Sequence, residues 1–523
     1  MGYEVIRMTR WFNIAGPCQP DIHYMLPATD RLPNVMPLIA QQAYVVLHAP
    51  RQSGKTTAML ALARALTAAE TYTAVLLTME VGAAFNDDPG AAERAILGDW
   101  HDAATWQLPA ALHPPPWPEA EPGARIGSAL RAWAAASARP LVVFLDEIDA
   151  LQDAALISVL RQLRAGFPRR PRAFPWALAL IGLRDVRDYK VASGGSARLS
   201  TASPFNIKTS SLTLDTFDQA DVAALYGQHT ADTGQIFTPE ASAHAFALTQ
   251  GQPWLVNALA KVAVEQLAPD RTQVITPTLI DQAKEVLIVR QDTHLDSLAE
   301  RLREPRVRAI IEPMLSGQSL GDIPPDDLRF VQDLGLVRLD PSDGLVVANP
   351  IYHEVLPRIL ASTAIASLPK ISPSWLTPEG RIAAPLLLDA FLAFWRQHGE
   401  PLLGTSPYAE IAPHLVMMAF LHRVANGGGT IDREYAIGRD RMDLCLRHGA
   451  DVFGMEVKVW RDRRPDPITD GLPQLEGYLA RLDLTTGWLI IFDQRRGQPP
   501  IAERTRTEVT VTASGRIITV IRA

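Results

Sequence analysis

The chain has 523 residues, of which 47% are hydrophobic and 20% are charged, and its formal net charge at pH 7 is −7. A chain of this length is too long for one ordinary core, and length alone predicts roughly three or four domains. The composition is typical of a soluble globular protein, the net charge excludes a bulk binder of polyanions, and no run of about 18 apolar residues is present that could cross a bilayer.

The cysteine content and the N-terminus bear on the cellular compartment. Cys18 and Cys445 are the two cysteines of the chain, too few for a disulfide framework or a zinc site of their own. Residues 1–11 lack the apolar core of a secretory signal peptide. We therefore expect a cytoplasmic protein with no membrane attachment.

The first half of the chain alternates short apolar segments with helical ones after an irregular lead-in. This lead-in, residues 1–36, is rich in Pro, Asn and Asp. Strands are predicted at 43–50, 73–80, 140–149 and 176–183, and a helix at 55–69. Near-continuous apolar strands separated by helices indicate a parallel sheet that is covered on both faces.

Helical periodicity replaces the strands between about residues 215 and 300. Residues 326–360 then follow the order helix, strand, turn, strand and helix, which resembles a winged-helix domain. The first of these helices carries Asp326, Asp327 and Asp333, which would repel the phosphates of DNA. We therefore expect an intramolecular lid or a dimer element there, and no DNA-reading helix.

A phosphate site is predicted in HAPRQSGKTTAM, residues 48–59, between a strand and a helix. Backbone N–H groups of such a loop and of the helix N-terminus favour bound phosphate. Lys55 would reach the β- and γ-phosphates of a nucleotide, and the Thr56 hydroxyl would hold Mg²⁺. Ala49 replaces the first glycine of the usual pattern, whereas Gly54 is kept where the backbone must pass close to the phosphates. The predicted nucleotide-binding residues of the loop are Ala49, Pro50, Arg51, Gln52, Ser53, Gly54, Lys55, Thr56 and Thr57.

Two acidic residues at the end of a later strand complete this prediction. Asp146 and Glu147 directly follow the apolar residues 141–145, so they lie at the carboxyl end of a predicted strand, where ligands bind in parallel sheets. Asp146 would coordinate Mg²⁺, and Glu147 would polarise the attacking water. The alternative is an ordinary helix N-terminus and an unrelated acidic strand end.

These residues resemble those of P-loop ATPases of the AAA+/STAND division, and the resemblance extends over roughly 20–360. It implies that Pro253, in TQGQPWLVNALA, packs near the adenine, that Arg184 senses a phosphate, and that His353 contacts the β-phosphate. For His353 the alternative is a surface or capping role. The arginines within 164–172 could include an arginine finger for a neighbouring subunit, although we favour a solvated basic loop.

A second site is predicted from DVFGMEVKVWRD, residues 451–462, where two charged residues interrupt an apolar strand. Side chains alternate between the two faces of a strand, so Glu456 and Lys458 share one face. Residues 438–449 form another alternating stretch. The turn between the two stretches predicts a β-hairpin, across which Asp443 and Glu456 can approach each other.

Glu410, near the start of a predicted helix over 406–429, is a third candidate carboxylate. Converging carboxylates are costly to bury without a cation, which indicates Mg²⁺ bound by Glu410, Asp443 and Glu456. Such a metal would activate water and polarise a phosphodiester, while Lys458 would fix or deprotonate the nucleophile. The alternative is a salt bridge between Glu456 and Lys458 at a sheet edge, with Asp443 in a turn.

An Asp followed, about a dozen residues later, by Glu-x-Lys on a strand resembles the PD-(D/E)XK nuclease superfamily. Gln474 and Tyr478, one helical turn apart in GLPQLEGYLARL, resemble the Q-x3-Y element of its RecB-like and Cas4-like branch. The resemblance covers about 386–495. It implies that the three carboxylates bind Mg²⁺ or Mn²⁺, that Lys458 is catalytic, and that Gln474 and Tyr478 assist.

The predicted fold class is α/β: a P-loop parallel-sheet ATPase core with a helical lid and a winged helix, followed by a PD-(D/E)XK nuclease-like α/β domain. The predicted domains are the lead-in (1–36), the ATPase core (37–214), the helical lid (215–300), the winged helix (301–362), a linker (363–385) and the nuclease-like domain (386–523). We expect ATP and Mg²⁺ as cofactors and DNA as the favoured nucleic-acid partner of the last domain; a homo-oligomer is an open alternative. The predicted function is an ATPase that controls a metal-dependent nuclease. The alternative is a STAND-type nucleotide switch or scaffold whose nuclease-like domain binds without cleaving.

Overall fold

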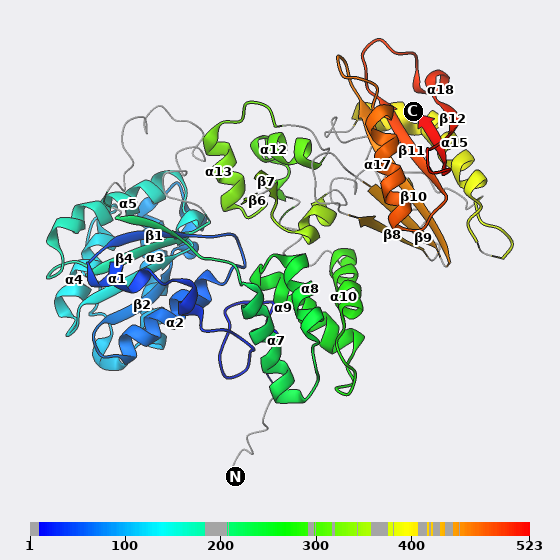
Figure 1. The fold of residues 1–523 in the computed structure, drawn as a ribbon. Coiled ribbons are helices and arrows are strands. Elements are labelled where there is room, and N and C mark those ends of the chain that lie inside the picture. Colours follow the sequence, from blue (N-terminus) through cyan, green and yellow to red (C-terminus); the bar gives the residue numbers. More distant parts are fainter. Residues whose placement is uncertain are drawn as a thin grey trace. The chain divides into compact units, whose positions relative to one another are not determined.

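The computed structural model separates into two compact units, which are described one at a time (Figure 1). The first unit comprises Met1–Arg290 and Pro325–Val337, and the second comprises Gln291–Pro324 and Arg338–Ala523. Within them, the structure describes residues 10–183, 207, 209–290, 298, 300–315, 320–341, 344–356, 375–379, 381–405, 416–417, 420–421, 429–434, 443–448 and 450–523.

The first unit contains a five-stranded sheet with the order β2-β3-β4-β1-β5, in which every described pairing is parallel. Its strands are β1 (Tyr44–His48), β2 (Thr73–Thr78), β3 (Leu141–Asp146), β4 (Ala177–Gly182) and β5 (Ser210–Thr213). The four predicted strands are thus confirmed, each a few residues shorter than its apolar run. A parallel α/β sheet is therefore present where the ATPase core is expected.

Helices cover both faces of this sheet (Figure 1). They are α1 (Val35–Ala40), α2 (Lys55–Ala68), α3 (Pro89–Gln107), α4 (Arg125–Ala136) and α5 (Asp153–Gly166), with short 3₁₀ turns at Ala28–Arg31, Glu80–Phe85, Ala110–Leu112, Ile148–Ala150 and Phe167–Arg169. Val143 of β3 packs in one core with Trp100 and Trp133, whereas its neighbour Phe144 packs in the other core with Leu62. Both faces of the strand are therefore buried, which explains its continuous apolar sequence.

The segment predicted to be a helical lid, called the lid below, follows β5 in the first unit. It consists of α7 (Gln219–Thr233), α8 (Pro239–Thr249), α9 (Pro253–Val262), the π-helical turn η8 (Ala263–Leu267) and α10 (Pro277–Arg290). The described part of the lead-in, from residue 10 onward, is largely irregular, as predicted, but it packs against these helices. Phe12 contacts Tyr226 and Tyr24 contacts His229, and Phe12 and Tyr24 are each 1% exposed.

The segment that resembles a winged helix has the predicted order of elements. It contains α12 (Pro305–Leu315), α13 (Pro325–Asp333), β6 (Val337–Asp340), β7 (Gly344–Val347) and helical residues 350–356. Its identity as a winged helix stays a prediction, because α13 is grouped with the first unit and β7 with the second.

The second unit contains a six-stranded mixed sheet with the order β12-β13-β11-β10-β9-β8. Its elements are α15 (Ala384–Thr405), β8 (Gly429–Glu434), β9 (Asp443–His448), β10 (Asp451–Trp460), α17 (Ile468–Arg481), β11 (Thr486–Asp493), α18 (Ile501–Arg504), β12 (Arg506–Val511) and β13 (Ile517–Arg522). The central strands β10, β11 and β13 are parallel, and the outer pairings are antiparallel. An α/β domain is therefore present where the nuclease-like domain is expected.

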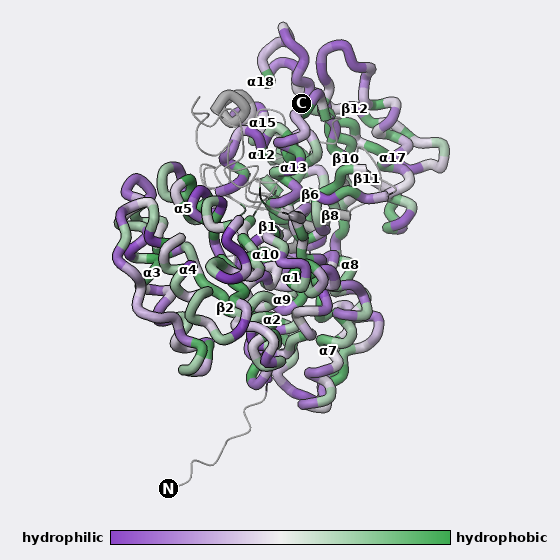
Figure 2. The backbone as a smooth tube through the Cα atoms, turned by 90° about the vertical axis from the view of Figure 1, so that its left-hand side faces the viewer, coloured by the Kyte–Doolittle hydropathy of each residue, from purple (hydrophilic) through white to green (hydrophobic). Residues whose placement is uncertain are grey.

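This sheet, too, is buried on both faces, and Figure 2 colours β10 and β11 mostly as hydrophobic. One core joins Met455 and Val457 of β10 to Trp395 of α15, and the other joins Leu489 of β11 to Tyr478 of α17. Among the described helices, none has the length and apolarity needed to cross a membrane.

Candidate functional site

The predicted phosphate loop joins the end of β1 to the start of α2. Two of its residues have positive φ angles, Gln52 at 57° and Gly54 at 89°, and glycine adopts this conformation without steric cost. The Lys55 side chain is 8% exposed, and its Nζ donates hydrogen bonds to the carbonyl oxygens of Ala49 (2.8 Å) and Pro50 (2.9 Å). Burial lowers the pKa of Lys55, while the nearby carboxylates of the site oppose this shift.

The structure brings together Thr56 and Asp146, which lie far apart in the sequence. Asp146 ends β3 and is 4% exposed. Thr56 Oγ1 donates a hydrogen bond of 2.7 Å to Asp146 Oδ2, and the Glu147 N–H donates one of 3.0 Å to Asp146 Oδ1. Burial raises the pKa of Asp146, an effect that these two hydrogen bonds oppose.

Glu147 occupies an unusual backbone conformation directly after this strand. Its φ angle is 53°, in the left-handed region that non-glycine residues rarely adopt. Such outliers cost about 1–3 kcal/mol and concentrate at functional sites. Burial also raises the pKa of Glu147, and the neighbouring carboxylates of Asp149 and Asp146 raise it further.

Arg31, which the sequence analysis did not identify, joins the phosphate loop to the start of the lid. Its Nη1 donates to Ser53 O at 2.9 Å, and its Nε donates to Asp215 O at 2.7 Å. The guanidinium also lies over the Phe217 ring, 5.0 Å from its centroid. Burial lowers the pKa of Arg31 to about 10. A single arginine in a four-residue 3₁₀ turn carries no periodic signal that could have predicted these contacts.

The predicted GxP element lies at the start of α9, where Pro253 is buried. Gly251 has a φ angle of 72°, and a Cβ at this position would lie 1.7 Å from Phe217 O, so only glycine fits. Trp254 Nε1 donates to Ile14 O at 2.9 Å. The lead-in therefore contacts this lid element directly, and the contact of Pro253 with adenine stays a prediction.

The lead-in also reaches the phosphate loop. The Cys18 N–H donates a hydrogen bond of 3.1 Å to Thr57 Oγ1. Thr57 was predicted as a nucleotide-binding residue, but its hydroxyl accepts a bond from the protein backbone. The lead-in, for which the sequence suggested no role, thus contacts the predicted phosphate loop.

The end of α13 packs against the other side of this loop. The Asp333 carboxylate lies 3.3 Å from His48 Nδ1, and a Cβ on Gly335 would lie 2.5 Å from Pro50 Cγ. The end of the acidic helix therefore contacts the phosphate loop within the first unit, and its role as a lid or dimer element stays a prediction.

The remaining predicted residues of the ATPase part are only partly tested. His353 lies in helical residues 350–356 of the second unit, and its phosphate contact stays a prediction. Arg184 lies outside the described residues. Arg170 stacks on Phe167, 3.5 Å from the ring centroid, and donates to Gln42 O, so it is engaged within the chain rather than offered to a neighbour.

In the second unit, Glu456 and Lys458 lie on β10, in the interior of the sheet and not at an edge. Lys458 Nζ lies 2.8 Å from Glu456 Oε1, and the two side chains are 13% and 0% exposed. Their register partners on β11, Leu489 and Ile491, belong to the core that α17 covers. Both charged groups therefore share the α17 face, as the alternation predicts. The salt bridge of the alternative is present, but it lies on a central strand and not at a sheet edge.

The predicted hairpin between β9 and β10 is confirmed. Asp443 occupies the register position directly opposite Glu456 in an antiparallel pairing. Glu410 lies outside the described residues, and so does the side chain of Asp443. Among the described side chains, no three His, Cys, Asp or Glu residues form a metal-binding group, so the three-carboxylate site stays a prediction.

Gln474 and Tyr478 lie on α17, one turn apart, as predicted. Tyr478 is fully buried, and a Cβ on Gly454 of β10 would lie 3.4 Å from its ring, so the helix approaches the sheet closely there. The Gln474 Oε1 atom is buried and has no hydrogen-bond partner among the described residues. A buried acceptor of this kind is expected to have a partner when the site is in use.

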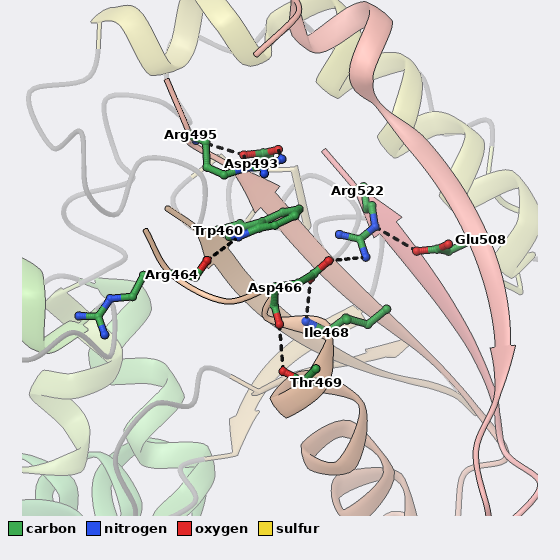
Figure 3. Close-up of polar contacts among 9 residues, drawn as sticks. All are labelled: Trp460, Arg464, Asp466, Ile468, Thr469, Asp493, Arg495, Glu508 and Arg522. Carbon is green, nitrogen blue, oxygen red and sulfur yellow. Dashed lines mark hydrogen bonds and ion pairs between the residues drawn. The ribbon is translucent and has the colours of Figure 1, made fainter. Parts of the chain in front are cut away.

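Polar contacts hold the start of α17 against the sheet (Figure 3). Asp466 accepts a hydrogen bond of 3.0 Å from the Ile468 N–H at the start of the helix and pairs with Arg522 of β13 at 2.9 Å. Arg495 lies over the Trp460 ring, 3.4 Å from its centroid, at the end of β10. These contacts fix the helix that carries Gln474 and Tyr478 relative to the strand that carries Glu456.

No family model and no curated protein matches this chain. Among solved structures, a Walker-type ATPase of Pyrococcus abyssi is similar over 66% of this chain and 99% of its own, with 13% identity and a TM-score of 0.47. The Aeropyrum pernix ORC1 protein, solved in complex with DNA, is similar over 65% of this chain and 94% of its own, with 13% identity and a TM-score of 0.35. The Thermotoga maritima RuvB Holliday junction branch migration motor is similar over 63% of this chain and 93% of its own, with 14% identity and a TM-score of 0.34. Because these TM-scores lie below 0.5, we base no functional step on the likenesses.

Proposed function

We propose that the chain binds ATP with Mg²⁺ at residues 49–57 and hydrolyses it. The observation that carries this proposal is the hydrogen bond of 2.7 Å between Thr56 Oγ1 and Asp146 Oδ2. It brings together a hydroxyl and a carboxylate, the oxygen ligands that Mg²⁺ prefers, beside a loop of backbone N–H groups. The bound ion would neutralise charge on the β- and γ-phosphates.

Lys55 and Glu147 have distinct roles in this proposal. Lys55 is buried and donates to two loop carbonyls, and it would exchange these partners for phosphate oxygens. Because burial disfavours its charged form, a bound anion would compensate it strongly. Glu147, beside Asp146 and held at a positive φ angle, would orient the attacking water and accept its proton.

We further propose that the second unit cleaves DNA phosphodiesters in a metal-dependent reaction. Its support is the buried ion pair of Glu456 and Lys458 in a central strand, with Asp443 opposite in register. Burying an ion pair costs desolvation energy that its attraction often does not repay, so packing alone is a weak reason for it. Glu456 and Asp443 would hold the metal ion, which activates water, and Lys458 would position the nucleophile.

Nucleotide control is the link between the two activities. The contact of α13 with the phosphate loop, through Asp333 and Gly335, supports it, because a change in the loop on ATP binding would alter this contact. The competing candidate is a nucleotide switch whose second unit binds DNA without cutting it.

Purified protein incubated with linear and circular DNA, Mg²⁺ or Mn²⁺, and with or without ATP tests both parts. We expect Lys55→Ala to lose ATP binding, Glu147→Gln to bind ATP without hydrolysing it, and Glu456→Ala to lose cleavage. Asp470→Ala is the matched control for Glu456→Ala, because Asp470 is an exposed carboxylate on α17.

The outcomes separate the candidates. Cleavage that is lost in Glu456→Ala and loses its ATP dependence in Lys55→Ala supports an ATP-controlled nuclease. ATP hydrolysis without cleavage under any condition supports the switch. Cleavage that is equal in Glu456→Ala and in wild type excludes the assigned nuclease site, and ATP binding by Lys55→Ala excludes the assigned nucleotide site.

A further inference from the structure

A cavity of about 360 Å³ lies between the lead-in and the lid of the first unit, apart from both sites described above. Its walls include Trp11 and Tyr24 of the lead-in, Lys261 of α9, Glu265 of η8, and Arg271 beyond that turn. Its volume lies within the range of small-molecule sites, about 300–1,000 Å³. Its lining residues include neither the phosphate loop nor Asp146 and Glu147 at the end of β3.

The cavity has an excess of positive charge. Lys261 pairs with Glu265 at 2.9 Å, and Arg10, which also lines the cavity, pairs with Asp232 at 2.9 Å. Arg271 has no ion-pair partner among the described residues. The Asp270 carboxylate, its neighbour in sequence, accepts hydrogen bonds from the backbone N–H and the hydroxyl of Thr272 instead.

Arg271 is held in place by neutral, buried groups. Its Nη1 donates to Gln235 Oε1 at 2.8 Å, and Gln235 is fully buried. The Gln235 amide nitrogen donates to the Ala268 carbonyl at 2.9 Å, so the oxygen of this side chain must face the arginine. Burial lowers the pKa of His229, the other polar neighbour of Arg271, which disfavours its charged form. A preorganised cation without a carboxylate is suited to an anionic ligand.

The aromatic wall supplies a second, independent feature. Tyr24 is 1% exposed, and its hydroxyl has no hydrogen-bond partner among the described residues. The Arg10 guanidinium lies over its ring, 5.2 Å from the centroid, and Trp11 stands beside it in the cavity wall. A buried hydroxyl without a partner is costly, so a ligand that accepts a hydrogen bond from it would be favoured. Aromatic walls also favour a flat ring.

We propose that this cavity binds a small organic anion, a phosphate or carboxylate group carried on a planar ring. Arg271 would bind the anionic group, Tyr24 would donate a hydrogen bond to it, and Trp11 would contact the ring. The site is separate from the nucleotide site.

Isothermal titration of the full-length chain with phenyl phosphate, benzoate and inorganic phosphate tests this proposal. We expect saturable binding of phenyl phosphate or benzoate, in wild type and equally in Lys55→Ala, in which the nucleotide site is disabled. The stronger of the two ligands identifies the anionic group. Inorganic phosphate, which lacks the ring, should bind at least about tenfold more weakly than phenyl phosphate.

Three variants distinguish a site from a general surface effect. Arg271→Gln should weaken binding at least about tenfold, because it removes a charged hydrogen-bond donor. Tyr24→Phe should weaken it about threefold at an unchanged melting temperature, because it removes only the hydroxyl without a partner. Arg94→Gln, which alters an exposed arginine of α3, should bind as wild type does.

The proposal is overturned if none of the probes binds saturably, if Arg271→Gln binds as tightly as wild type, or if inorganic phosphate binds as tightly as phenyl phosphate. It is also overturned if Lys55→Ala abolishes binding, since the probe would then occupy the nucleotide site. Retained binding by Lys55→Ala supports the site whether or not the chain hydrolyses ATP.

Discussion

The carboxylate of Asp333, at the end of α13, lies 3.3 Å from the imidazole of His48, at the end of β1. These side chains are 18% and 11% exposed, so the contact is largely shielded from water. His48 directly precedes the phosphate loop, and Gly335 packs against Pro50 within it. The phosphate loop and α13 are therefore connected by direct side-chain contacts.

Gly335→Ala is expected to disturb this connection. The added Cβ would lie 2.5 Å from Pro50 Cγ, and the φ angle of 72° would be strained for alanine. We expect a loss of about 1–3 kcal/mol in the free energy of unfolding from the strain, together with weaker ATP binding. Gly344→Ala is the matched control, because its φ angle of 74° is similar but nothing lies within 4 Å of its Cβ. Titration with ATP should show weaker binding by Gly335→Ala than by Gly344→Ala. Equal ATP affinities of the two variants would refute a connection through Pro50.

Arg31→Lys is expected to weaken ATP binding about tenfold while the chain remains folded. Lysine carries one compact charge and lacks the planar fork with which Arg31 bonds both Ser53 O and Asp215 O. The loss of one charge-assisted hydrogen bond corresponds to about tenfold in affinity. Calorimetric titration with Mg²⁺-ATP provides the measurement, and Arg161→Lys, at an exposed position of α5, is the control. An unchanged affinity would show that the phosphate loop does not depend on this arginine.

The pair of Glu456 and Lys458 should contribute little net stability. Lys458→Met would leave a fully buried carboxylate without its cation, which is expected to cost about 3–5 kcal/mol. The double variant Glu456→Leu/Lys458→Met should unfold within about 1 kcal/mol of wild type, because neither charge is then buried. Hydrogen exchange of peptides from β10 and α17 measures the stability of the single and of the double variant. A double variant as unstable as the single one would mean that the pair is kept for stability and not for chemistry.

Asp451 provides a prediction for pH dependence. Hydrogen bonding from Arg381 lowers the pKa of Asp451 below its ordinary value of 3.8, and the carboxylate also accepts a bond of 2.9 Å from the Ile382 N–H. The stabilisation is therefore present at every pH above the unfolded pKa and is lost as the pH falls through the lower folded pKa.

Asp451→Asn should accordingly be less stable than wild type by the same amount at pH 7 and pH 5, and this difference should shrink below about pH 4. This stability difference is measured by hydrogen exchange of the second unit at several pH values, with Asp470→Asn as the control. A difference that grows on acidification would contradict the assignment.

Much of the ATPase core could be predicted from local patterns. Continuous apolar runs identify β1 to β4, because strands of a parallel sheet are buried on both faces. The hairpin that sets Asp443 opposite Glu456 was predictable for a similar reason: its turn and the alternation of side chains determine the register. The contacts of Arg31 and Cys18 were not predictable, because a residue in a short turn or an irregular segment has no period from which its partner can be inferred.

Chain order and residue type were sufficient to place Lys55, Thr56, Asp146 and Glu147 at the carboxyl end of a parallel sheet. They were also sufficient to place Glu456 and Lys458 on one face of a strand. Tertiary packing decided that this strand is central, that α13 contacts the phosphate loop, and that the lead-in and the lid line an open cationic cavity. The physical reason is that periodicity reports which side of an element is buried, whereas the partner that buries it depends on the closure of long loops and the packing of distant segments.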